Sequence, residues 1–156
     1  MSGFYQIKKY IQYKLNAKDE HSIHSPFVFK LYTEEINSKN NYYAFDELNK
    51  IRKQLLINTQ TIEVVDVGAG SKKMSNTRKV ADIAQYSVVP KKYGELLFRL
   101  TNFFNPQSIV ELGTSLGISA LYLAKAAPNA NIISVEGCPN THAFAKNIIA
   151  STGVKN

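Results

Sequence analysis

Apolar side chains recur every three or four positions in the first part of the chain, which is the spacing of amphipathic helices. Residues 3–16 follow this pattern and predict a first helix. Ser25 followed by Pro26 predicts the start of a second helix, because serine caps helix N-termini and proline suits the first helical position. A third helix is expected over residues 43–57. Since these segments show no obvious catalytic set, we expect residues 1–60 to form a helical N-terminal extension or cap.

After residue 60 the pattern changes to short β-branched runs that alternate with helical segments. Strands are expected at 61–67, 108–112 and 131–135, and helices at 76–86, 90–104, 118–127 and 139–151. Asn105-Pro106 is expected to end the helix over 90–104. A strand, a helix and a strand within about 30 residues predict a parallel β-α-β unit with a right-handed crossover. The sequence therefore predicts an α/β fold. Residues 61–89 are expected to form a connecting strand, turn and helix between the N-terminal extension and the core. Residues 90–156 are expected to form the core, which is part of a Rossmann-like sheet.

Composition places the chain among ordinary globular proteins. The 156 residues are 44% hydrophobic and 20% charged, and no apolar run reaches the roughly 18–20 residues that a membrane span needs. The N-terminus lacks the apolar segment and cleavage site of a secretory signal. The single cysteine, Cys138, cannot form an internal disulfide. We therefore expect a soluble cytoplasmic protein.

The net charge of +7 raises the question of a nucleic-acid partner. However, no run of basic residues exceeds two, and no RNA-binding pattern of interleaved aromatic and basic residues is present. We therefore favour a solvated basic surface. A non-enzymatic module whose basic helical surface binds RNA or a protein stays as the alternative function.

Two glycine turns compete as the cofactor site, one at residues 68–71 and one at residues 113–117. A nucleoside cofactor needs a tight glycine turn at the end of a strand and a helix that starts there. It also needs an acidic residue about 20 positions further on, to hold the ribose. Only the second turn meets all three requirements, with Gly113, Gly117 and Glu136. The spacing lacks the close glycine pair that wraps a pyrophosphate, so S-adenosyl-L-methionine (SAM) suits it better than NAD. A packing turn without a ligand is the simpler alternative.

These residues resemble a known family. Residues 90–153 are similar to the class I SAM-dependent methyltransferases that act on oxygen atoms of small molecules. The shared features are Gly94-Glu95-Leu96-Leu97, then Glu111, Gly113, Gly117 and Ser119, then a strand ending in Glu136, and a helix with Ala145, Asn147 and Gly153. The segment His24-Ser25-Pro26-Phe27 and the turn at 68–71 are similar to uncharacterised bacterial members with a helical N-terminal extension.

The resemblance implies a role for each matched position. Glu111 and the loop 113–117 would face the methionine part of SAM, Ser119 would bind its carboxylate, Glu136 would hold the ribose, and residues 137–138 would pass beneath the adenine. The candidate cofactor-binding residues are therefore Glu111, Gly113, Thr114, Ser115, Gly117, Ser119, Glu136, Gly137 and Cys138. For the Cys138 thiol, an inert side chain is favoured over a nucleophile, because no His or Asp is positioned by the sequence to activate it.

The family fold has more strands than this sequence provides, so we expect a truncated chain whose catalytic residues lie beyond Asn156. The methyl acceptor would be a small molecule that the sequence does not identify. Exposed strand edges predict self-association. His21 and His24 are three residues apart, but no Cys or acidic motif accompanies them at ligand spacing, so no metal site is assigned. A nucleotide-dependent oxidoreductase or epimerase is disfavoured by the absence of the Gly-x-Gly pair.

Overall fold

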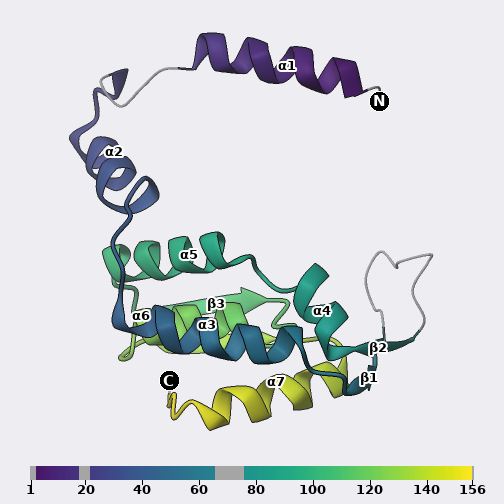
Figure 1. Ribbon diagram of the computed structural model, residues 1–156. Coiled ribbons are helices and arrows are strands. Elements are labelled where there is room, and N and C mark those ends of the chain that lie inside the picture. The colour runs from purple at the N-terminus through teal and green to yellow at the C-terminus, as the bar shows by residue number, and fades with distance from the viewer. Residues whose placement is uncertain (1–2, 18–21, 66–75, 156) are drawn as a thin grey trace. The chain divides into compact units, whose positions relative to one another are not determined.

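The computed structural model describes residues 3–17, 22–65 and 76–155, and the chain divides into two compact units, Met1–Lys39 and Asn40–Asn156. The first unit contains the helices α1 (Gly3–Asn16) and α2 (Pro26–Lys30) and the π-helix η2 (Leu31–Ile36) (Figure 1). The Ser25 hydroxyl accepts a hydrogen bond from the Val28 amide at 3.3 Å. This contact confirms the predicted helix start.

The second unit is an α/β arrangement with two small sheets. Strands β1 (Thr61–Glu63) and β2 (Thr77–Lys79) are antiparallel, whereas β3 (Ser108–Leu112) and β4 (Asn131–Val135) are parallel. The helices of this unit are α3 (Tyr43–Leu56), α4 (Val80–Tyr86), α5 (Lys91–Phe104), α6 (Ile118–Ala126) and α7 (Pro139–Ser151). The α/β class and the parallel pairing of the strands on either side of α6 are confirmed.

Helix α3 packs inside the second unit. Its buried residues Phe45 and Leu48 belong to the same hydrophobic core as Phe98 of α5 and Tyr122 of α6. The Phe45 ring lies 5.2 Å from the Phe98 ring and 6.1 Å from the Tyr122 ring, in edge-on geometry. The expected boundary at residue 60 therefore moves to Lys39, because the apolar face of α3 is part of this core.

The segment expected to be a single helix over residues 76–86 begins as a strand. Residues 77–79 form β2, with Thr61 opposite Lys79 and Glu63 opposite Thr77. The Val80 amide then donates to the Gln60 carbonyl at 2.8 Å, and α4 starts at Val80. The helix prediction was wrong at 77–79, because pairing with a distant strand supplies backbone hydrogen bonds that a local pattern does not contain. Strand β1 also ends at Glu63, earlier than expected.

The other elements lie within two residues of their expected ranges, except that the second helix, expected over residues 26–37, continues from Leu31 as the π-helix η2. Helix α5 ends at Phe104, and Asn105 follows in the left-handed conformation, with φ 43° and ψ 57°. Asparagine tolerates this conformation, which commonly ends helices. The prediction that Asn105-Pro106 ends this helix is confirmed. Among the described residues, no helix combines the length and apolar character that crossing a membrane requires.

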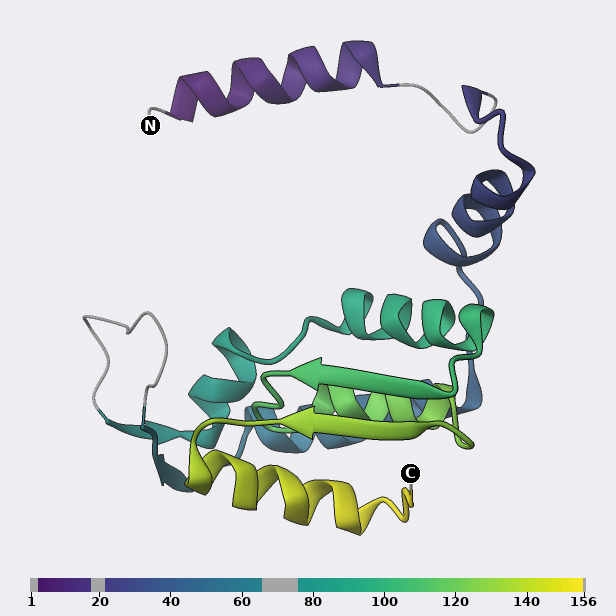
Figure 2. The same ribbon diagram turned by 180° about the vertical axis from the view of Figure 1, so that it is seen from behind.

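The two faces of the β3–β4 sheet differ in how far their side chains are buried. Side chains alternate in exposure along both strands, and Ile109, Glu111, Ile132 and Ser134 lie on the partly buried face. Figure 2 shows both strands in front of α3 and α6. The face turned away from these helices carries four large apolar side chains that are 48–82% exposed: Val110, Leu112, Ile133 and Val135.

Candidate functional site

The candidate residues gather where β3 and β4 end. The strands are in parallel register, with Glu111 opposite Ser134 and Leu112 opposite Val135, so their carboxyl ends lie at the same edge. The loop after β3 continues this pairing, because the Gly113 and Thr114 amides both donate to the Val135 carbonyl, at 2.8 and 3.1 Å. The register therefore brings the loop 113–117 beside the residues that follow β4.

Backbone conformation explains the two glycines of this loop. Gly113 has φ +95° and Gly117 has φ +85°, a region that other residues rarely adopt. A Cβ at Gly113 would meet no atom within 4 Å, so a ligand can approach the backbone there. A Cβ at Gly117 would lie 3.3 Å from the Ile149 side chain, so this glycine also serves helix packing. Packing thus accounts for Gly117, whereas ligand binding at Gly113 stays a prediction.

Glu136 already has two backbone partners. One carboxylate oxygen accepts from the Ser115 amide at 2.8 Å, and the other accepts from the Cys138 amide at 2.9 Å. The side chain therefore ties the loop after β3 to the loop after β4. Each carboxylate oxygen has a further acceptor position, so a hydroxyl can still bind. Sequence reasoning missed this structural role, since spacing alone does not show which backbone amides lie near the carboxylate.

Glu111 is held by a short chain of hydroxyl groups. The Ser134 hydroxyl donates to the Glu111 carboxylate, and the Thr114 and Ser134 hydroxyl oxygens lie 2.6 Å apart. Because Ser134 gives its proton to Glu111, Thr114 must be the donor to Ser134. Sequence reasoning missed Ser134. The signal was available, because Ser134 lies directly opposite Glu111 when the two strands are aligned by their lengths.

A cavity of about 310 Å³ adjoins the loop 113–117. Five candidates line it: Glu111, Gly113, Thr114, Ser115 and Ser119. The link between α4 and α5 contributes Ser87, Val88 and Val89, which sequence reasoning did not assign to the site. Gly117, Glu136, Gly137 and Cys138 are not in its lining. The structure thus brings together the residues predicted for the methionine part of the cofactor except Gly117. Glu136, Gly137 and Cys138, predicted for the ribose and adenine, also lie outside this cavity.

The start of α6 can receive an anionic group. The helix has no acidic residue in its first turn, and Ile118 and Ser119 of that turn line the cavity. First-turn amides have no partner within the helix, and the helix dipole places partial positive charge there. A carboxylate is therefore favoured at this end of the cavity, while the Glu111 carboxylate favours a cationic group at the other.

Cys138 is a buried residue that joins two elements. Its sulfur accepts a hydrogen bond from the Val65 amide at 3.4 Å, and the residue is 3% exposed. Burial raises the pKa of this thiol, but hydrogen bonds from Thr141, Val65 and Asn140 outweigh that effect, so the pKa lies below its ordinary value. The sulfur also lies 3.7 Å from the Glu63 carbonyl oxygen, so the side chain points toward β1, and Cys138 is not in the lining of the cavity. A cofactor contact at this position would have to use the backbone.

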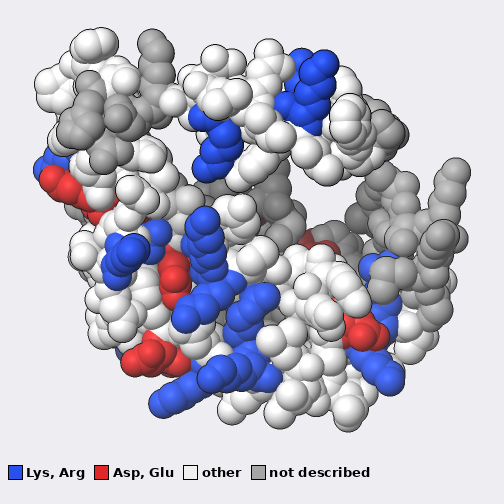
Figure 3. Space-filling model, turned by 45° about the horizontal axis from the view of Figure 1, so that its top comes forward, with Lys and Arg blue, Asp and Glu red and all other residues white. Residues whose placement is uncertain are grey.

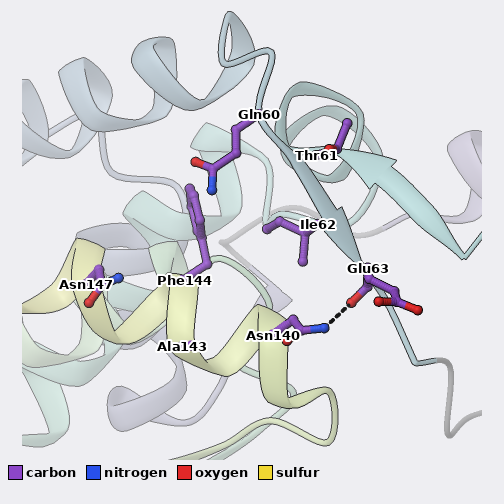
Figure 4. A pocket seen from close by; sticks show the side chains of 8 residues that line it. All are labelled: Gln60, Thr61, Ile62, Glu63, Asn140, Ala143, Phe144 and Asn147. Atoms are coloured by element: carbon purple, nitrogen blue, oxygen red, sulfur yellow. Dashed lines mark hydrogen bonds between the residues drawn. The ribbon is translucent and has the colours of Figure 1, made fainter.

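A second cavity of about 300 Å³ lies between β1 and α7 (Figure 4). It is lined by Gln60 and Glu63 on one side and by Asn140, Phe144 and Asn147 on the other. The side-chain amide of Asn140 donates from Nδ2 to the backbone carbonyl of Glu63 at 2.9 Å, which links the two walls. This cavity contains none of the predicted site residues.

The competing turn at residues 68–71 and His21 lie outside the described residues. Within the described ranges, no group of three or more His, Cys, Asp or Glu side chains is placed to hold a metal ion. The chain matches no known protein-family profile and no curated protein.

Proposed function

We propose that the β3–α6–β4 unit binds S-adenosyl-L-methionine and that the chain is the cofactor-binding portion of a SAM-dependent methyltransferase. The observation that carries this proposal is the position of Glu111, the glycine loop and Glu136 at the adjacent carboxyl ends of two parallel strands. Ligands of open α/β sheets bind at such ends. The resemblance noted above favours O-methyl transfer to a small molecule by the full-length protein.

The polar groups of the cavity fit the methionine part of SAM. Glu111 can accept from its ammonium group, while Ser119 and the first-turn amides of α6 can bind its carboxylate. Glu136 can accept from the ribose with the lone pairs that Ser115 and Cys138 do not use. SAM supplies an activated methyl group when bound. None of this chain's residues is assigned as a catalytic base.

Calorimetry of the 156-residue chain with S-adenosylhomocysteine tests the proposal. Glu111→Gln is the better variant, since Glu136→Ala would also break two backbone contacts and would confuse binding with folding. Because hydrogen bonds to a charged group contribute about 1.5–3 kcal/mol, we expect Glu111→Gln to weaken binding by about tenfold or more.

Glu63→Gln is the matched control, because Glu63 is an exposed acid of β1 outside the cavity. We expect its affinity for S-adenosylhomocysteine to equal that of the unmodified chain. Absence of heat at millimolar ligand, or equal affinity of Glu111→Gln and the unmodified chain, would contradict SAM binding at this site.

A further inference from the structure

A separate cavity of about 520 Å³ is bounded by α3 and the start of α5. Basic side chains dominate its lining: Lys50, Arg52, Lys53 and Lys91 contribute positive charge, and Asp46 contributes one carboxylate. Figure 3 shows Lys and Arg side chains gathered in the middle of one face, with few acidic side chains among them. None of the residues proposed to bind SAM lines this cavity, so it needs a different explanation.

The backbone of α3 explains why the basic side chains converge. Lys50 and Lys53 are three residues apart and therefore lie on neighbouring positions of one helix face, about one and two turns after Asp46. Arg52 donates from Nη1 to the Val89 carbonyl, which holds its guanidinium against the link that leads into α5. A guanidinium has further N–H donors that can bind a ligand. At least one cation of the cavity is thus fixed in position by the fold.

The start of α5 adds to the positive potential. This 14-residue helix has no acidic residue in its first turn, and Pro90 at its N-cap offers no side-chain partner to the first amides. The helix dipole therefore favours an anion at this end. Lys91 pairs with Glu95 at 3.6 Å, but its side chain is 59% exposed, and exposed ion pairs contribute only about 0–1 kcal/mol. An incoming anion can displace this contact.

We propose that this cavity binds a small molecule that bears two or more phosphate groups. Four cations around one hollow match a compact polyanion, and lysine and arginine both bind phosphate oxygens well. The cavity volume lies within the roughly 300–1,000 Å³ of small-ligand sites. An extended nucleic acid would instead need basic residues along a continuous stripe. Leu56, which is 37% exposed, offers an apolar contact beside the phosphates.

Titration calorimetry with pyrophosphate, ADP and adenosine tests this inference on the full chain. We expect pyrophosphate and ADP to bind, with affinity falling as ionic strength rises above about 0.1 M. Adenosine, which lacks phosphate, should show no binding that depends on Lys50 and Lys53. The double variant Lys50→Glu and Lys53→Glu should weaken binding by about tenfold or more. Both lysines are exposed, and circular dichroism would verify that the variant folds.

The matched control is the double variant Lys146→Glu and Lys155→Glu, which changes the net charge equally but elsewhere. We expect it to alter the affinity by less than about twofold, a difference well under 1 kcal/mol. Equal losses of affinity in the two double variants, or no saturable binding of pyrophosphate or ADP by the unmodified chain, would overturn the proposal. Binding of a single-stranded RNA without binding of pyrophosphate or ADP would also overturn it, in favour of a nucleic-acid surface. This cavity shares no lining residue with the cavity beside Glu111, and pyrophosphate contains no adenosine. The pyrophosphate result therefore does not depend on SAM binding.

Discussion

On one face of the β3–β4 sheet, Ile109 and Ile132 are partly buried, whereas on the other face Val110 is 66% exposed and Leu112 is 82% exposed. Both faces carry apolar side chains, which is the pattern of a parallel strand buried on both sides. In the second unit, α3 and α6 lie behind one of these faces (Figure 2). Apolar residues on both faces of a strand thus show that either face can be buried. Which face is buried depends on the neighbouring elements.

The largest expected difference between the two sides of the sheet is in stability. Leu121 of α6 is fully buried on the covered side, so Leu121→Ala should lower the free energy of unfolding by about 2–5 kcal/mol. Leu112→Ala, on the open face, should lower the free energy of unfolding by less than about 1 kcal/mol. Urea denaturation of both variants measures the difference. Equal losses would mean that the open face is buried in solution.

Close packing on the covered side predicts a second, smaller effect. A Cβ at Gly94 would lie 2.3 Å from the Tyr122 ring, so Gly94→Ala should destabilise by about 1–3 kcal/mol, although alanine favours helices by about 1 kcal/mol. In a Tyr122→Leu background the ring is absent, and the cost of Gly94→Ala should shrink. A double-mutant cycle in urea measures this coupling. Independent, additive losses would contradict the proposed clash.

The open face should promote self-association. Leu112 and Ile133 are exposed, and burying each in a contact contributes about 1.5–3 kcal/mol. We therefore expect Leu112→Lys with Ile133→Lys to weaken association by about tenfold or more in sedimentation velocity. Ile57→Lys is the control, since Ile57 is 78% exposed at the end of α3, away from this sheet. A monomer at high concentration before any substitution would contradict this prediction.

The smallest expected effect concerns a buried hydroxyl. The Tyr122 hydroxyl has no hydrogen-bond partner among the described residues, and burial, followed by the nearby Glu95 charge, raises its pKa to about 12. The unfolded tyrosine ionises near its ordinary pKa of about 10. The folded state therefore loses stability as pH rises from about 10 to about 12, where only the unfolded state releases the proton.

Tyr122→Phe removes this titration. At neutral pH we expect a change in stability within about 0.5 kcal/mol, because no hydrogen bond is lost. At about pH 11 the variant should be more stable than the unmodified chain. Urea midpoints at both pH values give the comparison. An identical pH dependence in the two proteins would show that this hydroxyl ionises normally in the folded state.

The candidate site could be predicted only in part. Gly113 and Glu111 follow from a strand ending in a glycine turn, and the structure places both at one cavity. Glu136 also ends the expected strand, yet its carboxylate binds the Ser115 and Cys138 amides. Ser87 to Val89 reach the cavity from a link whose local sequence carries no binding signal. Spacing along the chain indicates which strand ends meet, whereas it does not assign the partners of each polar atom.

The sequence by itself determined the helices α1, α3, α5 and α7 and the strands β3 and β4, because apolar periodicity and helix-ending residues act over a few positions. It also determined the glycine loop, since positive φ values at 113 and 117 call for glycine. Tertiary structure decided that residues 77–79 pair with β1, that α3 joins the core and that Glu136 ties two loops together. Each depends on contacts between residues far apart in the chain, and no local pattern encodes those contacts.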